Sequence, residues 1–189
     1  MIIEKTTLSD ILILTPKRFG DERGFFSESW NSRILKEAGL ELPEFVQDNH
    51  SFSREVGTIR GLHFQAPPHA QGKLVRCGRG SFFDVVVDIR RGSPTYGRWI
   101  GEELSFENGR QIWVPPGFLH GFLTRRPDTE IVYKCTDFYA PECEGCVYWN
   151  SPEIEIDWQF SDEPVISEKD AAAPHFSDFE SPFVWEGAA

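Results

Sequence analysis

The chain has 189 residues, a length that fits one domain, and its 16 Phe, 6 Trp, 16 Gly and 13 Pro favour antiparallel sheet over helix. The formal net charge of −11 argues against a surface built to hold DNA, RNA or anionic lipid, because such binding depends on neutralising many phosphates. The sequence has no run of 18 apolar residues and no secretory signal pattern, so we expect a cytoplasmic protein that binds neither nucleic acid nor membrane.

The amino-terminal part is predicted to form short strands followed by one helix. Residues 2–14 are predicted to be a pair of short strands, and residues 25–29 are a further extended stretch after a turn at 21–24. Residues 31–38 are predicted to be a short helix, because the segment begins with an asparagine cap and ends at Gly39.

From Phe45 onward, strands recur about every ten residues between turn clusters, which is the pattern of a β-sandwich or barrel. Side chains alternate between the two faces along a strand, so the residues of these strands can be grouped by face. One group is Lys73, Val75 and Cys77, a second is Ile131, Tyr133 and Cys135, and a third is Phe83, Val85, Val87 and Ile89, which lie opposite Phe82, Asp84, Val86 and Asp88.

The carboxyl-terminal part reads as irregular from Pro141, with a short helix predicted near residues 167–173. No repeat or linker divides the chain, so residues 1–189 are taken as one domain. The tail at 171–189 matches no motif, and its aromatic residues could be core, dimer contact or disordered chain. Cys143 and Cys146 have the spacing of half a zinc site or of a redox pair, but no second pair follows, so we assign them no function.

Two spaced motifs carry the main functional signal. The first runs from Gly57 to Gly80 and contains His63, and the second runs from Gly109 to His120. Together they resemble the two halves of the cupin signature, and that resemblance implies an all-β, cupin-type jelly-roll β-barrel with a few short helices.

Most of the metal ligands expected in the first motif are missing. Metal-binding cupins carry His, His and Glu where this chain has His63, Gln65 and Lys73. A catalytic first-row metal needs three or more His or carboxylate donors, and an ammonium group repels a divalent ion. We therefore expect a protein without metal or other cofactor, in which a histidine base lies beside a cation that attracts an oxyanion.

Several further stretches identify a more specific resemblance. The chain resembles the dTDP-4-dehydrorhamnose 3,5-epimerase family over about residues 15–170, through RGLHFQ at 60–65, KLVR at 73–76, FDVVVDIR at 83–90, PPGFLHGF at 115–122, YKCTD at 133–137, YAPE at 139–142 and SEKD at 167–170. The resemblance implies epimerisation at C3 and C5 of dTDP-4-dehydro-6-deoxy-D-glucose to dTDP-4-dehydro-L-rhamnose, in dTDP-L-rhamnose biosynthesis. The C4 ketone acidifies the hydrogens at C3 and C5, so such a reaction needs a base, an acid across the ring and a group that holds the enolate oxygen.

The resemblance also implies a role for each of four catalytic residues. His63 is the expected base, since a neutral imidazole titrates near the operating pH, and Asp170 is the carboxylate that orients it. Lys73 is expected to stabilise the enolate oxygen, and Tyr133 is expected to be the acid on the far face of the sugar.

Eleven further residues lie at positions that resemble the family's contacts to substrate, with Tyr139 stacked on the thymine ring and Phe26 as a second wall. They are Arg23, Phe26, Glu28, Gln47, Asp48, Asn49, Arg60, His120, Tyr139, Glu144 and Lys169. The family forms a homodimer with exchanged amino-terminal strands, so Arg23, Phe26 and Glu28 are candidates for the partner's site. Asp84 is left unassigned, either orienting His120 or pairing within the sheet.

Three alternatives stay open at this point. A relative that inverts only C3 or only C5 would keep the same base, lysine and often the tyrosine. A catalytically silent sugar-nucleotide-binding cupin would be expected to have lost His63, Lys73 or Tyr133, and none is lost. A metal-dependent oxygenase or isomerase would be revived by stoichiometric Fe, Ni or Zn in the purified protein.

Overall fold

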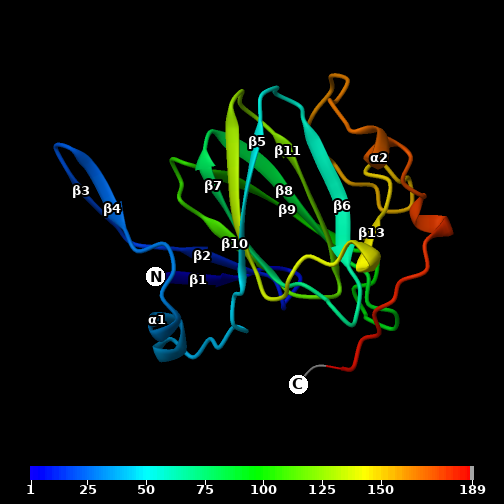
Figure 1. Cartoon of the computed structure of the whole chain (residues 1–189), viewed down its shortest axis with the longest axis horizontal. Coiled ribbons are helices and arrows are strands. Elements are labelled where there is room, and N and C mark those ends of the chain that lie inside the picture. The colour runs from blue at the N-terminus through cyan, green and yellow to red at the C-terminus, as the bar shows by residue number, and fades with distance from the viewer. Residues whose placement is uncertain (188–189) are drawn as a thin grey trace.

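The computed structural model describes residues 1–187, which form two facing antiparallel sheets and a separate hairpin (Figure 1). The six-stranded sheet has the order β1 (Ile2–Lys5), β2 (Leu12–Thr15), β10 (Gln111–Val114), β7 (Lys73–Arg79), β12 (Thr129–Cys135) and β5 (Gln47–Ser53). The five-stranded sheet has the order β13 (Glu144–Cys146), β6 (Ile59–Gln65), β11 (Phe118–Thr124), β8 (Ser81–Asp88) and β9 (Trp99–Ser105). The hairpin consists of β3 (Arg18–Asp21) and β4 (Gly24–Ser27). The predicted all-β jelly-roll architecture is confirmed.

Helices are few and short, as the sequence predicts. α1 (Ser32–Glu37) begins after Asn31, whose side chain accepts hydrogen bonds from two backbone amides of the first turn, and α2 (Glu168–Ala171) begins after Ser167. Two single-turn 3₁₀ helices span Pro141–Cys143 and Phe176–Asp178. Among residues 1–187, no helix is long and apolar enough to cross a membrane.

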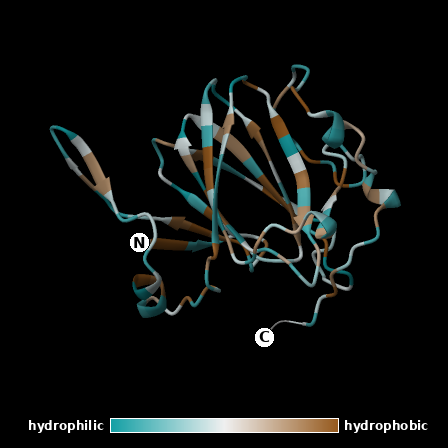
Figure 2. Ribbon diagram, in the orientation of Figure 1, coloured by the Kyte–Doolittle hydropathy of each residue, from teal (hydrophilic) through white to brown (hydrophobic). Residues whose placement is uncertain are grey.

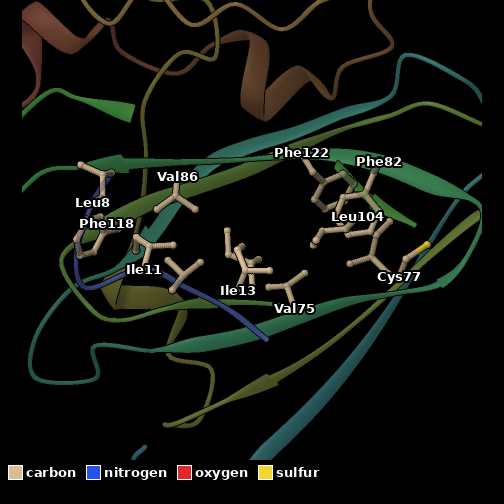
Figure 3. Packing of buried hydrophobic residues seen from close by; sticks show 13 residues of the cluster. Leu8, Ile11, Ile13, Val75, Cys77, Phe82, Val86, Leu104, Phe118 and Phe122 are labelled. Atoms are coloured by element: carbon tan, nitrogen blue, oxygen red, sulfur yellow. The ribbon is translucent and has the colours of Figure 1, made fainter. Parts of the chain in front are cut away.

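The main core lies between the two sheets and contains the side chains that strand alternation assigns to one face (Figure 3). Phe82 and Val86 of β8 point into this core, where they meet Val75 and Cys77 of β7 and Ile131 of β12. Figure 2 shows the corresponding bands of hydrophobic and hydrophilic residues along β6. The predicted faces of β7, β8 and β12 are therefore confirmed.

A second core covers the outer face of the five-stranded sheet. It contains Phe83, Val85, Val87 and Ile89, and the carboxyl-terminal segment packs on them through Ile154, Trp158 and Phe183. The ring centroids of Phe183 and Phe64 are 6.0 Å apart. Within the tail left open by the sequence, Phe183 is thus a core residue, whereas Ala188 and Ala189 lie outside the described residues.

Candidate active site

A cavity of about 500 Å³ opens between the two sheets, beside α2. Its walls come from β6 and β11 of one sheet, β7 and β12 of the other, and the segment that leads into α2. The lining residues are Ser51, Thr58, Ile59, Arg60, His63, Lys73, His120, Phe122, Ile131, Tyr133, Val165, Ile166, Ser167, Lys169 and Asp170. All four residues predicted to be catalytic therefore line one cavity. Asp170 reaches it although it is 107 residues from His63 in the sequence.

His63 and Asp170 form a close polar contact in the cavity, with 2.6 Å between Nε2 and Oδ1. Ser167 caps α2 by accepting the Asp170 amide hydrogen at 3.1 Å, which fixes the carboxyl group against β6. Burial alone would raise the pKa of Asp170, but the hydrogen bond and charge of His63 outweigh it, so this pKa lies below its ordinary value. An ionised carboxylate only accepts hydrogen bonds, so Nε2 carries the proton of this contact, and Nδ1 is the nitrogen that can accept a proton in the neutral ring.

Two glycines allow β6 and β11 to lie close together where they carry His63 and His120. These two histidines are directly opposite each other in the strand pair, and the register shifts just after His120. Gly61 has φ +131°, and a Cβ built on it would lie 2.6 Å from the Cα of Gly121. A side chain at Gly61 would force the two strands, and therefore the two histidines, apart.

Lys73 is a cation without a carboxylate partner. Its side chain lines the cavity, and no Asp or Glu oxygen among residues 1–187 lies within 4.0 Å of its ammonium group. Burial lowers the pKa of Lys73, while the charges of Cys135, Glu144 and Asp84 act in the opposite direction. A cation in this setting has its hydrogen-bond donors free for an anionic ligand atom.

Tyr133 lies on the wall formed by the six-stranded sheet, on the strand next to that of Lys73. The strand register places Tyr133 opposite Asn49 of β5 and Val75 of β7. Burial raises the pKa of the Tyr133 hydroxyl, partly offset by a hydrogen bond from Asn49, so the hydroxyl keeps its proton at neutral pH. The cavity therefore has a proton donor on one sheet and the His63 ring on the other.

The sequence leaves the role of Asp84 open, and the structure shows which residue it contacts. Its Oδ2 lies 2.8 Å from Nε2 of His120, and the side chain is fully buried. Burial raises the pKa of Asp84, and the charges of His120 and Lys73 counteract this only in part. Strand alternation placed Asp84 on the same face as Phe82 and Val86, which was the signal that it points into the barrel.

Other predicted substrate-binding residues surround the mouth of the cavity. The Arg60 guanidinium donates hydrogen bonds to Oγ of Ser53 at 3.3 Å and to the backbone oxygen of Phe52 at 3.1 Å. At the rim, Glu144 Oε2 accepts from Lys169 at 2.5 Å and from the Tyr139 hydroxyl at 3.1 Å.

The three predicted site residues of β5 lie on two opposite faces of the strand. Gln47 donates to Asn49 at 3.0 Å, and its own side-chain oxygen accepts the Tyr139 amide hydrogen at 3.0 Å, so both lie on the cavity side. Asp48 points to the opposite face of the sheet and pairs with Lys134 at 2.9 Å. The structure therefore does not bring Asp48 to this cavity.

The amino-terminal candidates lie far from the cavity of their own chain. The β3–β4 hairpin extends away from the sheets (Figure 1), and Phe26 of β4 is 70% exposed. Arg23 pairs with Asp21 at 2.5 Å, and Glu28 accepts a hydrogen bond from Asn31 at 3.0 Å. None of Arg23, Phe26 and Glu28 lines the cavity.

The chemistry of the cavity residues is that of proton transfer. Within residues 1–187, no group of three or more His, Cys, Asp and Glu side chains is arranged to hold a metal ion. Each of the two cavity histidines hydrogen-bonds a carboxylate instead, and Cys143 and Cys146 are free thiols. A base, a phenol and an unpaired ammonium group can together remove and return a proton beside a carbonyl.

Comparison with known proteins gives one consistent result. A family model for dTDP-4-dehydrorhamnose 3,5-epimerase matches residues 5–178. The chain is 55% identical over 174 residues to the dTDP-4-dehydrorhamnose 3,5-epimerase of Salmonella typhimurium, covering 92% of this chain and 94% of that one. It is 52% identical to the enzyme of the same name from Pseudomonas aeruginosa, covering 92% and 95%.

A solved structure agrees with these sequence comparisons. It is a dTDP-6-deoxy-D-glucose-3,5-epimerase from Legionella pneumophila in complex with dTDP-4-keto-L-rhamnose, with a TM-score of 0.93 and 43% identity over 98% of this chain and 99% of that chain. The resemblance stated from sequence motifs is confirmed, and the chain belongs to the dTDP-4-dehydrorhamnose 3,5-epimerase family.

Proposed function

We propose that this protein epimerises dTDP-4-dehydro-6-deoxy-D-glucose at C3 and C5 to dTDP-4-dehydro-L-rhamnose, as a step of dTDP-L-rhamnose biosynthesis. The observation that carries the proposal is the 2.6 Å His63–Asp170 pair in a cavity that also holds Lys73 and Tyr133. Family membership supplies the substrate class, and the Legionella relative binds a dTDP-linked 4-keto sugar.

The base in this mechanism is His63. Its Nδ1 removes the proton from the carbon next to the C4 ketone, and Asp170 stabilises the imidazolium that forms. The lowered pKa of Asp170 keeps its carboxylate ionised throughout the neutral pH range, so the ring remains in one tautomer.

Charge then develops on the C4 oxygen as the enolate forms. Lys73 donates to that oxygen, and its position in a partly dry cavity makes the interaction stronger than it would be in water. Tyr133 returns a proton to the opposite face of the ring, which inverts the carbon. Because protons are only moved, the substrate is neither oxidised nor reduced, and the reaction requires no redox cofactor.

Binding of the nucleotide is assigned to the residues around the mouth of the cavity. Arg60 and Lys169 supply positive charge for the diphosphate in an otherwise acidic protein. Tyr139 is 55% exposed at the rim and offers its ring for stacking on thymine. Substrate would compete for groups that now pair with one another, such as Glu144 with Lys169.

The protein is further proposed to act as a homodimer that exchanges its amino-terminal strands. The hairpin supports this proposal, because it leaves the body of the chain and exposes Phe19 and Phe26 to the extent of 54% and 70%. In such a dimer Arg23, Phe26 and Glu28 would complete the cavity of the partner subunit.

The decisive experiment is turnover of dTDP-4-dehydro-6-deoxy-D-glucose in deuterated water, with the product trapped by an NADPH-dependent reductase and analysed by NMR. We expect solvent deuterium at both C3 and C5, and an L-rhamnose configuration in the trapped product. Label at one carbon alone would identify a monoepimerase, and absence of label would identify a binding protein without catalytic activity.

A further inference from the structure

Asp84 and Asp88 are two fully buried carboxylates on the same strand, and their surroundings differ sharply. Asp88 accepts five hydrogen bonds, three from Arg90 and one each from the hydroxyls of Ser93 and Thr95. Asp84 accepts one, from His120, and its Oδ1 has no hydrogen-bond partner among residues 1–187. A buried carboxylate so poorly satisfied costs folding free energy, so structure alone does not explain it.

The charged groups around Asp84 come from three neighbouring strands. His120 of β11 forms the hydrogen bond, and Glu102 of β9 lies directly opposite in the strand register and pairs with Arg110. Lys73 of β7 reaches the same interior and has no carboxylate within 4.0 Å, yet the charge of Asp84 acts on it. Glu144, which also acts on Lys73, is already paired with Lys169. Cys135, the remaining group whose charge acts on Lys73, is a thiol whose pKa burial raises, so Asp84 is the buried carboxyl group available as a counter-charge for Lys73.

We propose that Asp84 is a positioning residue of the active site, which holds His120 with its Nε2 protonated and supplies the counter-charge that keeps Lys73 in its ammonium form. The role in turnover rests on the proposed epimerase function, because Lys73 is there the donor to the C4 oxygen. The effect on Lys73 itself does not depend on that function and can be measured without substrate.

The test is an NMR titration of the Lys73 Cε resonance, assigned by comparison with a Lys73→Arg sample, in the wild type and in Asp84→Asn. Asparagine keeps an acceptor for His120 and removes only the negative charge. We expect the pKa of Lys73 to fall by about one unit in Asp84→Asn, since a unit charge several ångströms away in a protein interior is worth roughly 1–2 kcal/mol. Asp84→Glu, which restores the charge, should return the pKa toward the wild-type value.

Asp88→Asn is the matched control, because Asp88 is an equally buried carboxylate on the same strand. It should lower the melting temperature and leave the Lys73 titration unchanged. An unchanged Lys73 titration in Asp84→Asn would overturn the counter-charge proposal, as would an equal shift in Asp88→Asn.

A second measurement uses only the wild type, so it holds even if Asp84→Asn fails to fold. In ¹⁵N-histidine-labelled protein at pH 8, we expect the Nε2 of His120 to carry a proton, and an unprotonated Nε2 would overturn the proposal.

In the epimerase assay, kcat at pH 8 should fall about tenfold in Asp84→Asn, with KM changed less than about threefold. Deuterium incorporation by the wild type tests the epimerase function separately, so failure of either proposal can be recognised.

Discussion

At the scale of single residues, the positions of some cavity side chains could be predicted from the sequence. The contacts of others could not. Strand alternation placed Lys73 and Tyr133 on interior faces, and the structure confirms those faces. Asp170 lies in a polar segment where no periodic pattern indicates burial, so only the family resemblance pointed to it. The sequence left Asp84 either orienting His120 or pairing within the sheet, and the packing of β8 against β11, which no local pattern specifies, puts it 2.8 Å from His120.

His63→Asn is the substitution that tests the base. Asparagine is close in shape to the part of the histidine side chain nearest the backbone, but it cannot accept a proton near neutral pH. We therefore expect deuterium exchange at C3 and C5 to fall by at least about 10³-fold. Binding of dTDP, measured by calorimetry, should stay within about threefold of the wild type, because the nucleotide contacts lie at the rim. Unchanged turnover would rule out His63 as the base.

At the scale of secondary-structure elements, the two helices and most strands follow their sequence signals. Asn31 is found as the cap that the sequence predicts, and the short helix predicted near residues 167–173 begins after Ser167, which caps it. β13 was not predicted, because Glu-Gly-Cys shows no alternation and three residues have little intrinsic preference for a strand. It forms since β6 offers an edge on which Cys146 pairs opposite His63.

Ser167→Ala tests whether the cap of α2 places Asp170. Loss of an N-cap costs about 0.5–2 kcal/mol, and in a helix of one turn we expect that loss to free the Asp170 carboxyl group from its position beside His63. The expected result is a kcat reduced about 3–30-fold with KM for the sugar nucleotide little changed, measured by initial rates. Ser161→Ala, an exposed serine in the same segment, is the control. Equal kcat in both variants would show that the cap does not position Asp170.

At the scale of the whole molecule, the two hydrophobic cores have different roles: one holds the sheets together and the other supports the sheet that carries the site. The inner core joins the sheets, while the outer core ties the carboxyl-terminal segment to the back of the sheet that carries His63 and His120. Residue composition predicted the sheets, but not that Phe183 returns across the chain to reach Phe64. The direction of the β3–β4 hairpin could likewise not be predicted from local pattern, since the pairing of two short strands does not specify how the pair leaves the sheets.

Phe183→Ala measures the contribution of that outer core. Removing a buried aromatic side chain typically costs about 3–5 kcal/mol, which for a domain of this size lowers the melting temperature by roughly 6–20 °C. Phe138→Ala, which removes a phenylalanine that is 63% exposed, should change it by less than about 2 °C. Differential scanning calorimetry of both variants is the measurement, and a Phe183→Ala curve equal to the wild type would show that the tail adds no stability.

The contact between Gly61 and Gly121 has a practical consequence for anyone who wishes to redesign this enzyme. Mutant libraries aimed at new sugar substrates usually randomise every position near a cavity, and these two glycines lie within two residues of its histidines in sequence. A new Cβ at Gly61 would lie 2.6 Å from the facing backbone, and one at Gly121 would lie 3.0 Å from the Arg60 oxygen, so we expect members that vary Gly61 to be lost to misfolding before substrate preference is sampled. Diversity is better concentrated on Ser51 and Ile166, which line the cavity and do not belong to the core between the sheets.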